Sequence, residues 1–326
     1  MSVDSETRGA WNWAPIVGRW AIEAQRVGYL GPQDDKIRPY GVCVSNADLG
    51  DGSVFARVSV GEDRSGESRF TVGNIVLGYR SEEQRYVMAG LGGWHRAYTI
   101  GEFEPSLGWR ALATAGVEEN LSLGQQYSLR VSLTGQRVSL AVDGVHVLEH
   151  VLEKPLRWKQ VGLFAFGKGE TDFSDFSVDQ RPGKLFVVMP LCEPYKQLHE
   201  KVIAPLAKQK PFGLDAQHAG QMFGPGVILR DIEQSIVDAK VVIAELTPAS
   251  ESEFNPNVFY ELGYAHALGK PTILLAERER VNRLPFDISG FRVLFYNNTI
   301  LGTKQFEEEL KGYLEAILPD SSGNGA

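Results

Sequence analysis

The sequence has little cysteine, since Cys43 and Cys192 are the only two in 326 residues. They fall in different candidate domains, so we expect no disulfide framework and favour a reducing compartment. We expect both to be small, buried, apolar side chains. The opening MSVDSETRGAWNW lacks a basic start followed by an apolar run, and nowhere do about 18 consecutive apolar residues occur. We therefore expect a cytoplasmic protein without a membrane partner.

Neither half of the chain has an excess of basic residues. The net charge is −8, and from Gly183 onward 14 Lys plus Arg face 18 Asp plus Glu, which leaves −4 for each part. This balance excludes a basic nucleic-acid platform. Paired Cys/His metal spacing, a GxGxxG loop and a GxxxxGK[ST] loop are also absent, so we expect no metal and set aside dehydrogenases and P-loop NTPases.

A chain of this length is expected to hold two domains. At Gln180–Gly183 the sequence pattern changes. Short β-type runs precede this point, and continuous apolar strands and amphipathic helices follow it. We predict a first domain over 1–182, a second over 183–319, and a disordered polar tail over 320–326.

The first domain reads as an all-β sandwich. Alternating apolar positions predict two antiparallel strands, formed by Tyr127, Leu129, Val131 and Leu133 and by Val138, Leu140 and Val142. Asp143-Gly144 predicts a tight turn into a third strand, and the runs QVGLFAF from Gln160 and TDFSDFSV from Thr171 follow. The stretch QQYSLRVSLTGQRVSLAVDGVHV and this rhythm resemble the concanavalin-like jelly roll of laminin-G and related carbohydrate-binding domains, over about residues 12–180. The resemblance implies a carbohydrate or another ligand on the sandwich.

Two pairs of residues in this domain are candidates for a catalytic or sugar-binding site. Glu102 and Glu104 would share one face of a strand, as paired carboxylates do in jelly-roll glycosidases, but the longer acidic motif of those enzymes is absent. Trp94 and His95 follow a glycine cluster and could form an exposed stacking platform for a sugar. We favour ordinary sandwich core for Trp94.

The second domain alternates strands and helices. We predict strands at Leu185–Met189, 213–217, 241–246, 272–275 and 292–296, and helices at 193–207, 227–239, 256–268 and 303–317. Continuous apolar strands separated by helices indicate a flavodoxin-like parallel sheet covered on both faces.

Ligands of such sheets bind at the carboxyl ends of the strands. The residues there are Met189, Pro190 and Leu191 after the first strand, and Glu245 at the end of VVIAEL, where a ribose hydroxyl would be its natural partner. These are positional predictions of substrate-binding residues.

The segment NPNVFYELGYAHALGKP is the most informative in the chain. Asn255 or Asn257 can cap a short helix, and Gly269 can end it. Glu261 lies near the helix N-terminus, where a carboxylate can meet a substrate. Asn257 is equally well a plain cap or a ligand contact, and we interpret His266 on the same helix as structural.

The runs LFVVMP, DAKVVIAELT and NPNVFYELGYAHALGKPTILL resemble nucleoside 2-deoxyribosyltransferases and their TIR-like relatives, over about 135 residues. In those families the glutamate of the ELG triplet does the chemistry, and the matching residue is Glu261. One carboxylate can stabilise or capture the oxocarbenium-like ribosyl centre of N-glycoside cleavage. Asn255-Pro256-Asn257-Val258 stands where deoxyribosyltransferases often have a Gly-Thr type approach, which favours the TIR-like branch.

The resemblance implies an enzyme with NAD as substrate and no cofactor: an NAD glycohydrolase of antiphage defence, active as a homo-oligomer, with the sandwich as a sensing or assembly domain. Two alternatives stay open. One is nucleoside deoxyribosyl transfer or N-glycoside hydrolysis in salvage, which keeps Glu261 as the catalytic residue. The other is a non-catalytic module that binds a nucleotide and a glycan.

Overall fold

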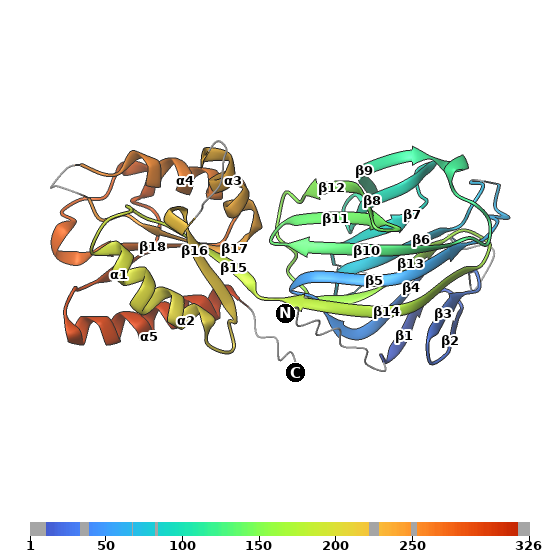
Figure 1. Cartoon of the computed structure of the whole chain (residues 1–326), viewed down its shortest axis with the longest axis horizontal. Helices are drawn as coiled ribbons and strands as arrows, with labels where there is room; N and C mark the ends of the chain where they lie inside the picture. Colours follow the sequence, from blue (N-terminus) through green and yellow to red (C-terminus); the bar gives the residue numbers. More distant parts are fainter. Residues whose placement is uncertain are drawn as a thin grey trace. The chain divides into compact units, whose positions relative to one another are not determined.

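The computed structural model describes residues 11–32, 39–66, 68–81, 84–221, 228–248 and 253–318. The chain forms two compact units. Unit 1 comprises Met1–Leu152 and Leu156–Arg181, and unit 2 comprises Glu153–Pro155 and Pro182–Ala326. Figure 1 draws unit 1 as strands and unit 2 as a mixture of strands and helices. The predicted tail 320–326 lies outside the described residues.

Unit 1 consists of two antiparallel sheets, each with seven strands in the described ranges. Sheet one has the order β1 (Trp13–Val17), β4 (Tyr40–Asp48), β13 (Gln160–Phe166), β6 (Val72–Tyr79), β7 (Tyr86–Leu91), β8 (Arg96–Glu104) and β9 (Gly108–Val117). Sheet two has the order β12 (Val145–Val151), β11 (Arg137–Val142), β10 (Gln126–Thr134), β5 (Asp51–Val60), β14 (Thr171–Arg181), β3 (Arg26–Tyr29) and β2 (Trp20–Ile22). A 3₁₀ turn, η1 (Glu118–Asn120), follows β9.

The core of the sandwich follows from the period of two in its strands. Leu129 and Val131 of β10 and Leu140 of β11 are fully buried and belong to one cluster between the sheets. The turn between β11 and β12 has positive φ at Asp143 (49°) and Gly144 (80°), which a two-residue hairpin turn of this type requires. The predicted meander of three strands is therefore confirmed.

Sheet one also carries a second apolar cluster on its outer face. Its buried members are Val42, Val44, Val72, Val76, Tyr79, Tyr86, Met88 and Phe164. An antiparallel sheet in a sandwich commonly turns a polar face outward, so this face is unusual.

Unit 2 contains a parallel sheet in the order β16 (Leu214–His218), β15 (Gly183–Val188), β17 (Ala239–Glu245), β18 (Thr272–Glu277) and β19 (Val293–Tyr296). One helical run contains α1 (Tyr195–Leu198), η2 (His199–Ile203) and α2 (Ala204–Lys208). The remaining helices are α3 (Ile228–Asp238), α4 (Pro256–Ala267) and α5 (Ile300–Ile317), with short turns η3 (Ala219–Gln221), η4 (Arg278–Arg280) and η5 (Phe286–Ile288).

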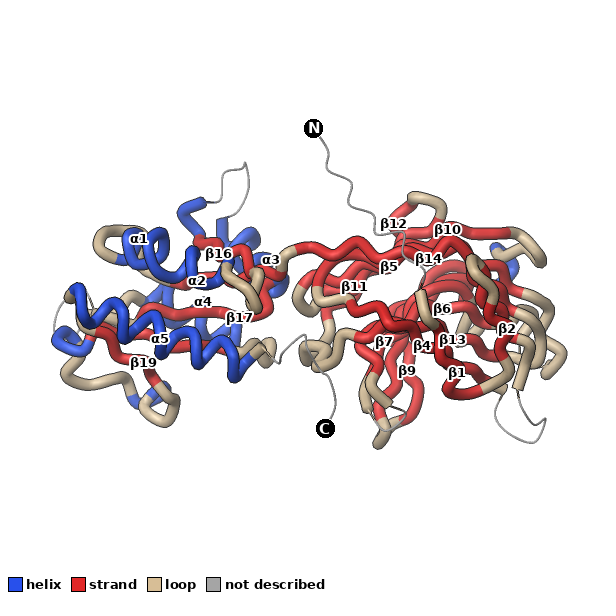
Figure 2. Tube along the Cα trace, turned by 90° about the horizontal axis from the view of Figure 1, so that it is seen from below, coloured by secondary structure: helices blue, strands red, loops and turns tan. Residues whose placement is uncertain are grey.

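Helices cover both faces of this sheet (Figure 2). In Figure 1, α3 and α4 lie on one side, and α1, α2 and α5 on the other. Val241 and Ile243 of β17 pack in the cluster with Leu206 and Leu310, while Val242 and its neighbours pack in the cluster of α3 and α4. Both faces of β17 are thus apolar, as in a strand buried in a parallel sheet. The predicted fold class, an all-β sandwich followed by a flavodoxin-like α/β sheet, is confirmed.

Candidate functional site

Helix α4 is held at both ends by local hydrogen bonds. The Asn255 side chain accepts from the Asn257 backbone N–H at 3.0 Å, and Pro256 occupies the first turn. At the other end Gly269, with a φ of 64°, donates to the His266 carbonyl at 2.9 Å. The next residue, Lys270, donates to the Ala265 carbonyl at 3.0 Å, which completes a Schellman motif. Of the two predicted caps, Asn255 is the one that caps the helix.

Glu261 lies in the second turn of α4, beside the buried face formed by Val258, Leu262 and Ala265. Its side chain is partly buried. No hydrogen bond or ion pair joins its carboxylate to any of the described residues. Burial therefore acts without compensation and raises the pKa of Glu261 to about 7. A desolvated carboxyl group at the helix end nearest the carboxyl edge of a parallel sheet has the properties of a functional residue.

Glu245 ends β17 and is 2% exposed. One of its carboxylate oxygens accepts hydrogen bonds from the backbone N–H (2.9 Å) and from the hydroxyl of Thr247. The Thr247 hydroxyl in turn accepts from the Glu277 backbone N–H at 2.8 Å. Burial, partly offset by these bonds, raises the pKa of Glu245 to about 7. The group holds together the chain segments that follow β17 and end β18.

Glu245 and Glu261 belong to opposite faces of the sheet. Alternation along β17 puts Glu245 on the same face as Val241 and Ile243, which pack against the α2 and α5 side. Helix α4, with Glu261, covers the other face. A role for Glu245 in holding ribose stays a prediction, and its buried contacts are those of a loop-fixing residue.

The three predicted residues after β15 differ in exposure. Met189 is 7% exposed and packs in the hydrophobic core, Pro190 is partly buried, and Leu191 is 48% exposed. The side chain of Asn257, at the N-terminal turn of α4, is exposed. Leu191 and Asn257 are therefore the two of these residues whose side chains are largely open to solvent.

Other residues singled out in the sequence have structural partners. His266 is within 3.1 Å of the Thr272 hydroxyl and stacks on Phe291 at 4.7 Å. Glu102 is fully buried and forms ion pairs with Arg85 and Arg110. The two arginines balance the charge of the Glu102 carboxylate, so Glu102 has the contacts of a structural residue and not of a catalytic one.

The cysteine prediction is half wrong. Cys43 is fully buried, and burial raises the pKa of its thiol to about 12. Cys192 is exposed in the segment that follows β15, because it lies beyond the last core residue of that strand, Met189. An exposed position leaves its sulfur outside the hydrophobic clusters.

The prediction that Trp94 is ordinary core is wrong. Trp94 is 41% exposed, and it and His95 have positive φ values of 51° and 57°. Gly92 and Gly93 before them have positive φ as well, so the chain makes a left-handed turn between β7 and β8. This turn lifts the indole out of the strand, onto the outer face of sheet one.

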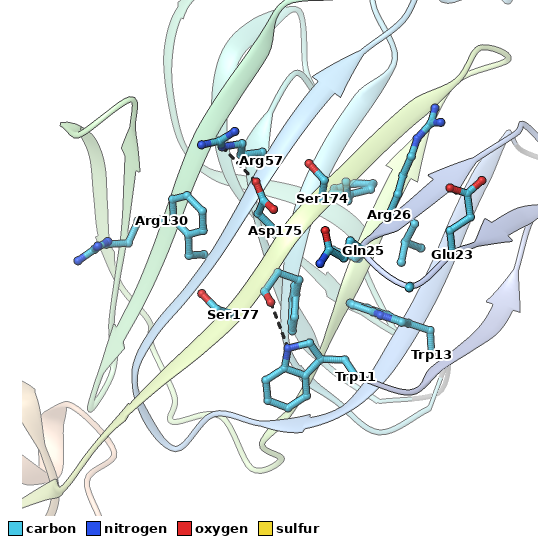
Figure 3. Close-up of a pocket in the computed structure, with 16 residues that line it drawn as sticks. Trp11, Trp13, Glu23, Gln25, Arg26, Arg57, Arg130, Ser174, Asp175 and Ser177 are labelled. Atoms are coloured by element: carbon cyan, nitrogen blue, oxygen red, sulfur yellow. Dashed lines mark hydrogen bonds and ion pairs between the residues drawn. The ribbon is translucent and has the colours of Figure 1, made fainter. Parts of the chain in front are cut away.

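Unit 1 contains a cavity of about 710 Å³, and Figure 3 draws the residues that line it. Its lining includes Trp11 and Trp13, which are neighbours in Figure 3, and the arginines Arg26, Arg57 and Arg130. The charges are largely paired, since Arg26 binds Asp172 at 2.8 Å and Arg57 binds Asp175 at 3.3 Å. The Trp11 indole N–H donates to the Phe176 carbonyl at 3.1 Å.

The described residues include neither a metal-binding cluster nor a membrane-spanning helix. No group of three or more His, Cys, Asp and Glu side chains in these ranges is placed to hold a metal ion. Within the same ranges, no helix combines the length and the apolar character needed to cross a membrane.

No protein-family model matches the chain. No curated protein matches it either. Several solved structures are similar in part. The carbohydrate-binding module CBM66 from Bacillus subtilis is 14% identical over 50% of this chain and 92% of its own, with a TM-score of 0.40. A Bacillus subtilis protein of unknown function with a galectin-like fold is 12% identical over 52% of this chain and 89% of its own, with a TM-score of 0.38.

A third solved structure is similar to another part of the chain. The 2-desoxiribosyltransferase from Leishmania mexicana is 19% identical over 39% of this chain and 98% of its own, with a TM-score of 0.29. At these identities and TM-scores, none of the three likenesses carries a functional conclusion for this chain.

Proposed function

We propose that unit 2 cleaves the N-glycosidic bond of a nucleotide, with NAD as substrate and Glu261 as the catalytic residue. The observation that carries the proposal is the Glu261 carboxyl group, desolvated and unpaired among the described residues, with its pKa raised to about 7. A carboxylate held out of water interacts more strongly with a developing positive charge than a solvated one does.

The chemistry needs one well-placed anion. As the bond between nicotinamide and ribose breaks, positive charge develops at the anomeric carbon, and the ionised Glu261 stabilises that centre or captures it as a ribosyl ester. Nicotinamide leaves with the bonding electron pair as a neutral base, so no general acid is required. Water then completes hydrolysis at the ribosyl carbon.

The proposal also covers the biological role of the enzyme and the role of unit 1. The resemblance of the ELG segment to TIR-like effectors supports a cytoplasmic enzyme of antiphage defence that depletes NAD when it assembles as a homo-oligomer. NAD acts in it as substrate, and no cofactor is needed. Unit 1 would then act as the sensing or assembly domain.

The test is to incubate the purified full chain, at high concentration, with NAD and separately with deoxynucleosides, and to follow base release by chromatography. Glu261→Gln is the test variant, and Glu308→Gln, on the exposed side of α5, is the matched control. Nicotinamide released by the unsubstituted and control proteins alone supports the proposal. Free base from deoxynucleosides alone would instead assign the unit to nucleoside salvage. Equal release by Glu261→Gln would remove Glu261 from the mechanism.

A further inference from the structure

A small cavity of about 200 Å³ lies on the outer face of sheet one. Its walls are almost wholly apolar and aromatic, and they are formed by Val72, Asn74, Met88, Gly93, Trp94, Trp109, Phe164 and Phe166. Exposed or accessible apolar hollows of this kind mark binding sites more often than plain surface does. The cavity is formed by residues of unit 1, whereas Glu261 belongs to unit 2.

The strand register places one polar side chain in the middle of this apolar face. Asn74 of β6 is paired with Phe164 of β13 on one side and with Gly90 of β7 on the other. Because Gly90 has no side chain, the Asn74 amide lies against the Gly90 backbone: a Cβ on Gly90 would stand 2.7 Å from the Asn74 Oδ1. Asn74 is therefore the one hydrogen-bonding side chain among the residues that line the cavity, apart from the two indoles.

The Asn74 amide is unsatisfied. Its side chain is 0% exposed, and neither Oδ1 nor Nδ2 has a hydrogen-bond partner in the described residues. Buried amides in folded proteins are nearly always hydrogen-bonded, because leaving one unpaired is costly. A buried amide without a partner at the wall of a cavity is the arrangement expected where a ligand completes the pairing.

Trp94 forms the solvent-exposed part of the cavity wall. Its ring rests on the backbone of β8, where a Cβ on Gly101 would stand 2.7 Å from the indole. The indole is 41% exposed and is carried by the left-handed turn of Gly92 to His95. Residues held in such sparsely populated backbone regions cluster at ligand sites. The Asn74 amide is fully buried, and Trp94 has the most exposed side chain of the cavity wall, so the Trp94 ring is the one whose rotation would admit a ligand.

We propose that this cavity binds a planar aromatic carboxamide. Aromatic walls accept a flat ring, and a carboxamide offers the donor and acceptor that pair with the acceptor and donor of Asn74. The volume suits a single ring, since sites for larger organic ligands are usually about 300–1,000 Å³. A saccharide fits poorly, because its many hydroxyl groups need several polar partners and the cavity provides one amide.

The larger cavity of Figure 3 is a weaker candidate for such a ligand. Its arginines Arg26 and Arg57 already pair with acidic side chains, and the indole N–H of Trp11 already donates to a carbonyl. A ligand there would have to compete with those bonds. In the small cavity, pairing with Asn74 breaks none.

The test is isothermal titration of the full chain with nicotinamide, accompanied by tryptophan fluorescence, with nicotinate as the control ligand. We expect nicotinamide to bind and to change the fluorescence of Trp94 or Trp109. Nicotinate is expected to bind at least about tenfold more weakly, because its carboxylate cannot donate to Oδ1 and loses water on entering an apolar site.

Two variants separate this site from the proposed active site. Asn74→Leu is expected to bind nicotinamide at least about tenfold more weakly while its unfolding midpoint is unchanged or raised, since an apolar side chain replaces an unpaired amide. Glu261→Gln is expected to bind as the unsubstituted chain does, so the result is independent of the proposed reaction. Absence of nicotinamide binding at millimolar concentration, full binding by Asn74→Leu, or binding of neutral sugars in its place would overturn the proposal.

Discussion

Replacing Glu261 by glutamine is expected to stabilise unit 2, and more so at high pH. The folded-state pKa is raised from 4.5 to about 7, so the folded state holds this proton more tightly than the unfolded state does. The ionised group therefore costs folding free energy above pH 4.5, and the cost is complete above about pH 7. Glutamine has the same shape and no charge, and it removes the cost.

The magnitude follows from the same two values. A difference of 2.5 between 4.5 and about 7 corresponds to an upper limit of about 3.5 kcal/mol at about 1.4 kcal/mol per pH unit. Glu261 is only partly buried, so solvent screening reduces this to about 1–2 kcal/mol at pH 8 and to under about 0.5 kcal/mol at pH 5.

Urea unfolding of the full chain at pH 5 and pH 8, read through the transition of unit 2, measures the effect. Glu308→Gln, an exposed glutamate on α5, serves as the control and is expected to change little at either pH. A Glu261→Gln protein that is destabilised at pH 8, or changed equally at both pH values, would refute the claim that this carboxylate is desolvated without compensation. We expect the Glu261→Gln protein to be more stable and inactive, the trade-off typical of functional residues.

Three further substitutions test the structural account. Lys270→Met removes a buried ammonium that donates to the Val237 and Ala239 carbonyls at 2.6 and 2.7 Å, and should cost about 2–3 kcal/mol in urea unfolding; a cost under about 0.5 kcal/mol would contradict this assignment. Burial first, and then His218, lowers the pKa of His199, so its contribution is present above pH 6.5 and is lost as the pH falls below that value. His199→Phe should therefore flatten the acid limb of the curve of melting temperature against pH, and an unchanged limb would speak against it. Glu102→Gln leaves Arg85 and Arg110 without their shared anion and should lower the stability of unit 1 by about 2 kcal/mol, measured by calorimetry, whereas a neutral effect would mean that solvent already screens the pair.

The bounds of helix α4 could be predicted almost to the residue, because capping residues close in the sequence determine both of its ends. Asn255 and Pro256 start it, and Gly269 ends it. The positions of these two helix ends do not depend on tertiary packing, so the sequence alone was sufficient to predict them. The same holds for the Asp143-Gly144 turn.

The surroundings of the candidate sites depended on packing and were harder to predict. Glu245 was predicted to bind substrate at the carboxyl end of its strand. Its side chain points to the same face of β17 as Val241 and Ile243, which is the α5 side of the sheet, and this alternation was visible in the sequence. Trp94 was expected in the core, and the left-handed turn that exposes it depends on two consecutive non-glycine residues with positive φ, which no local pattern indicates. Asn74 had a signal that sequence reasoning missed, a lone amide within an otherwise apolar strand.

The pH profile of NAD cleavage tests the central claim most directly. If ionised Glu261 stabilises the ribosyl centre, kcat/KM for nicotinamide release should rise tenfold per pH unit at low pH and level off with a midpoint near pH 7, the pKa of the free group. The Glu261→Gln protein should show no such rise. A profile that is flat through pH 7, or one that Glu261→Gln reproduces, would contradict the account.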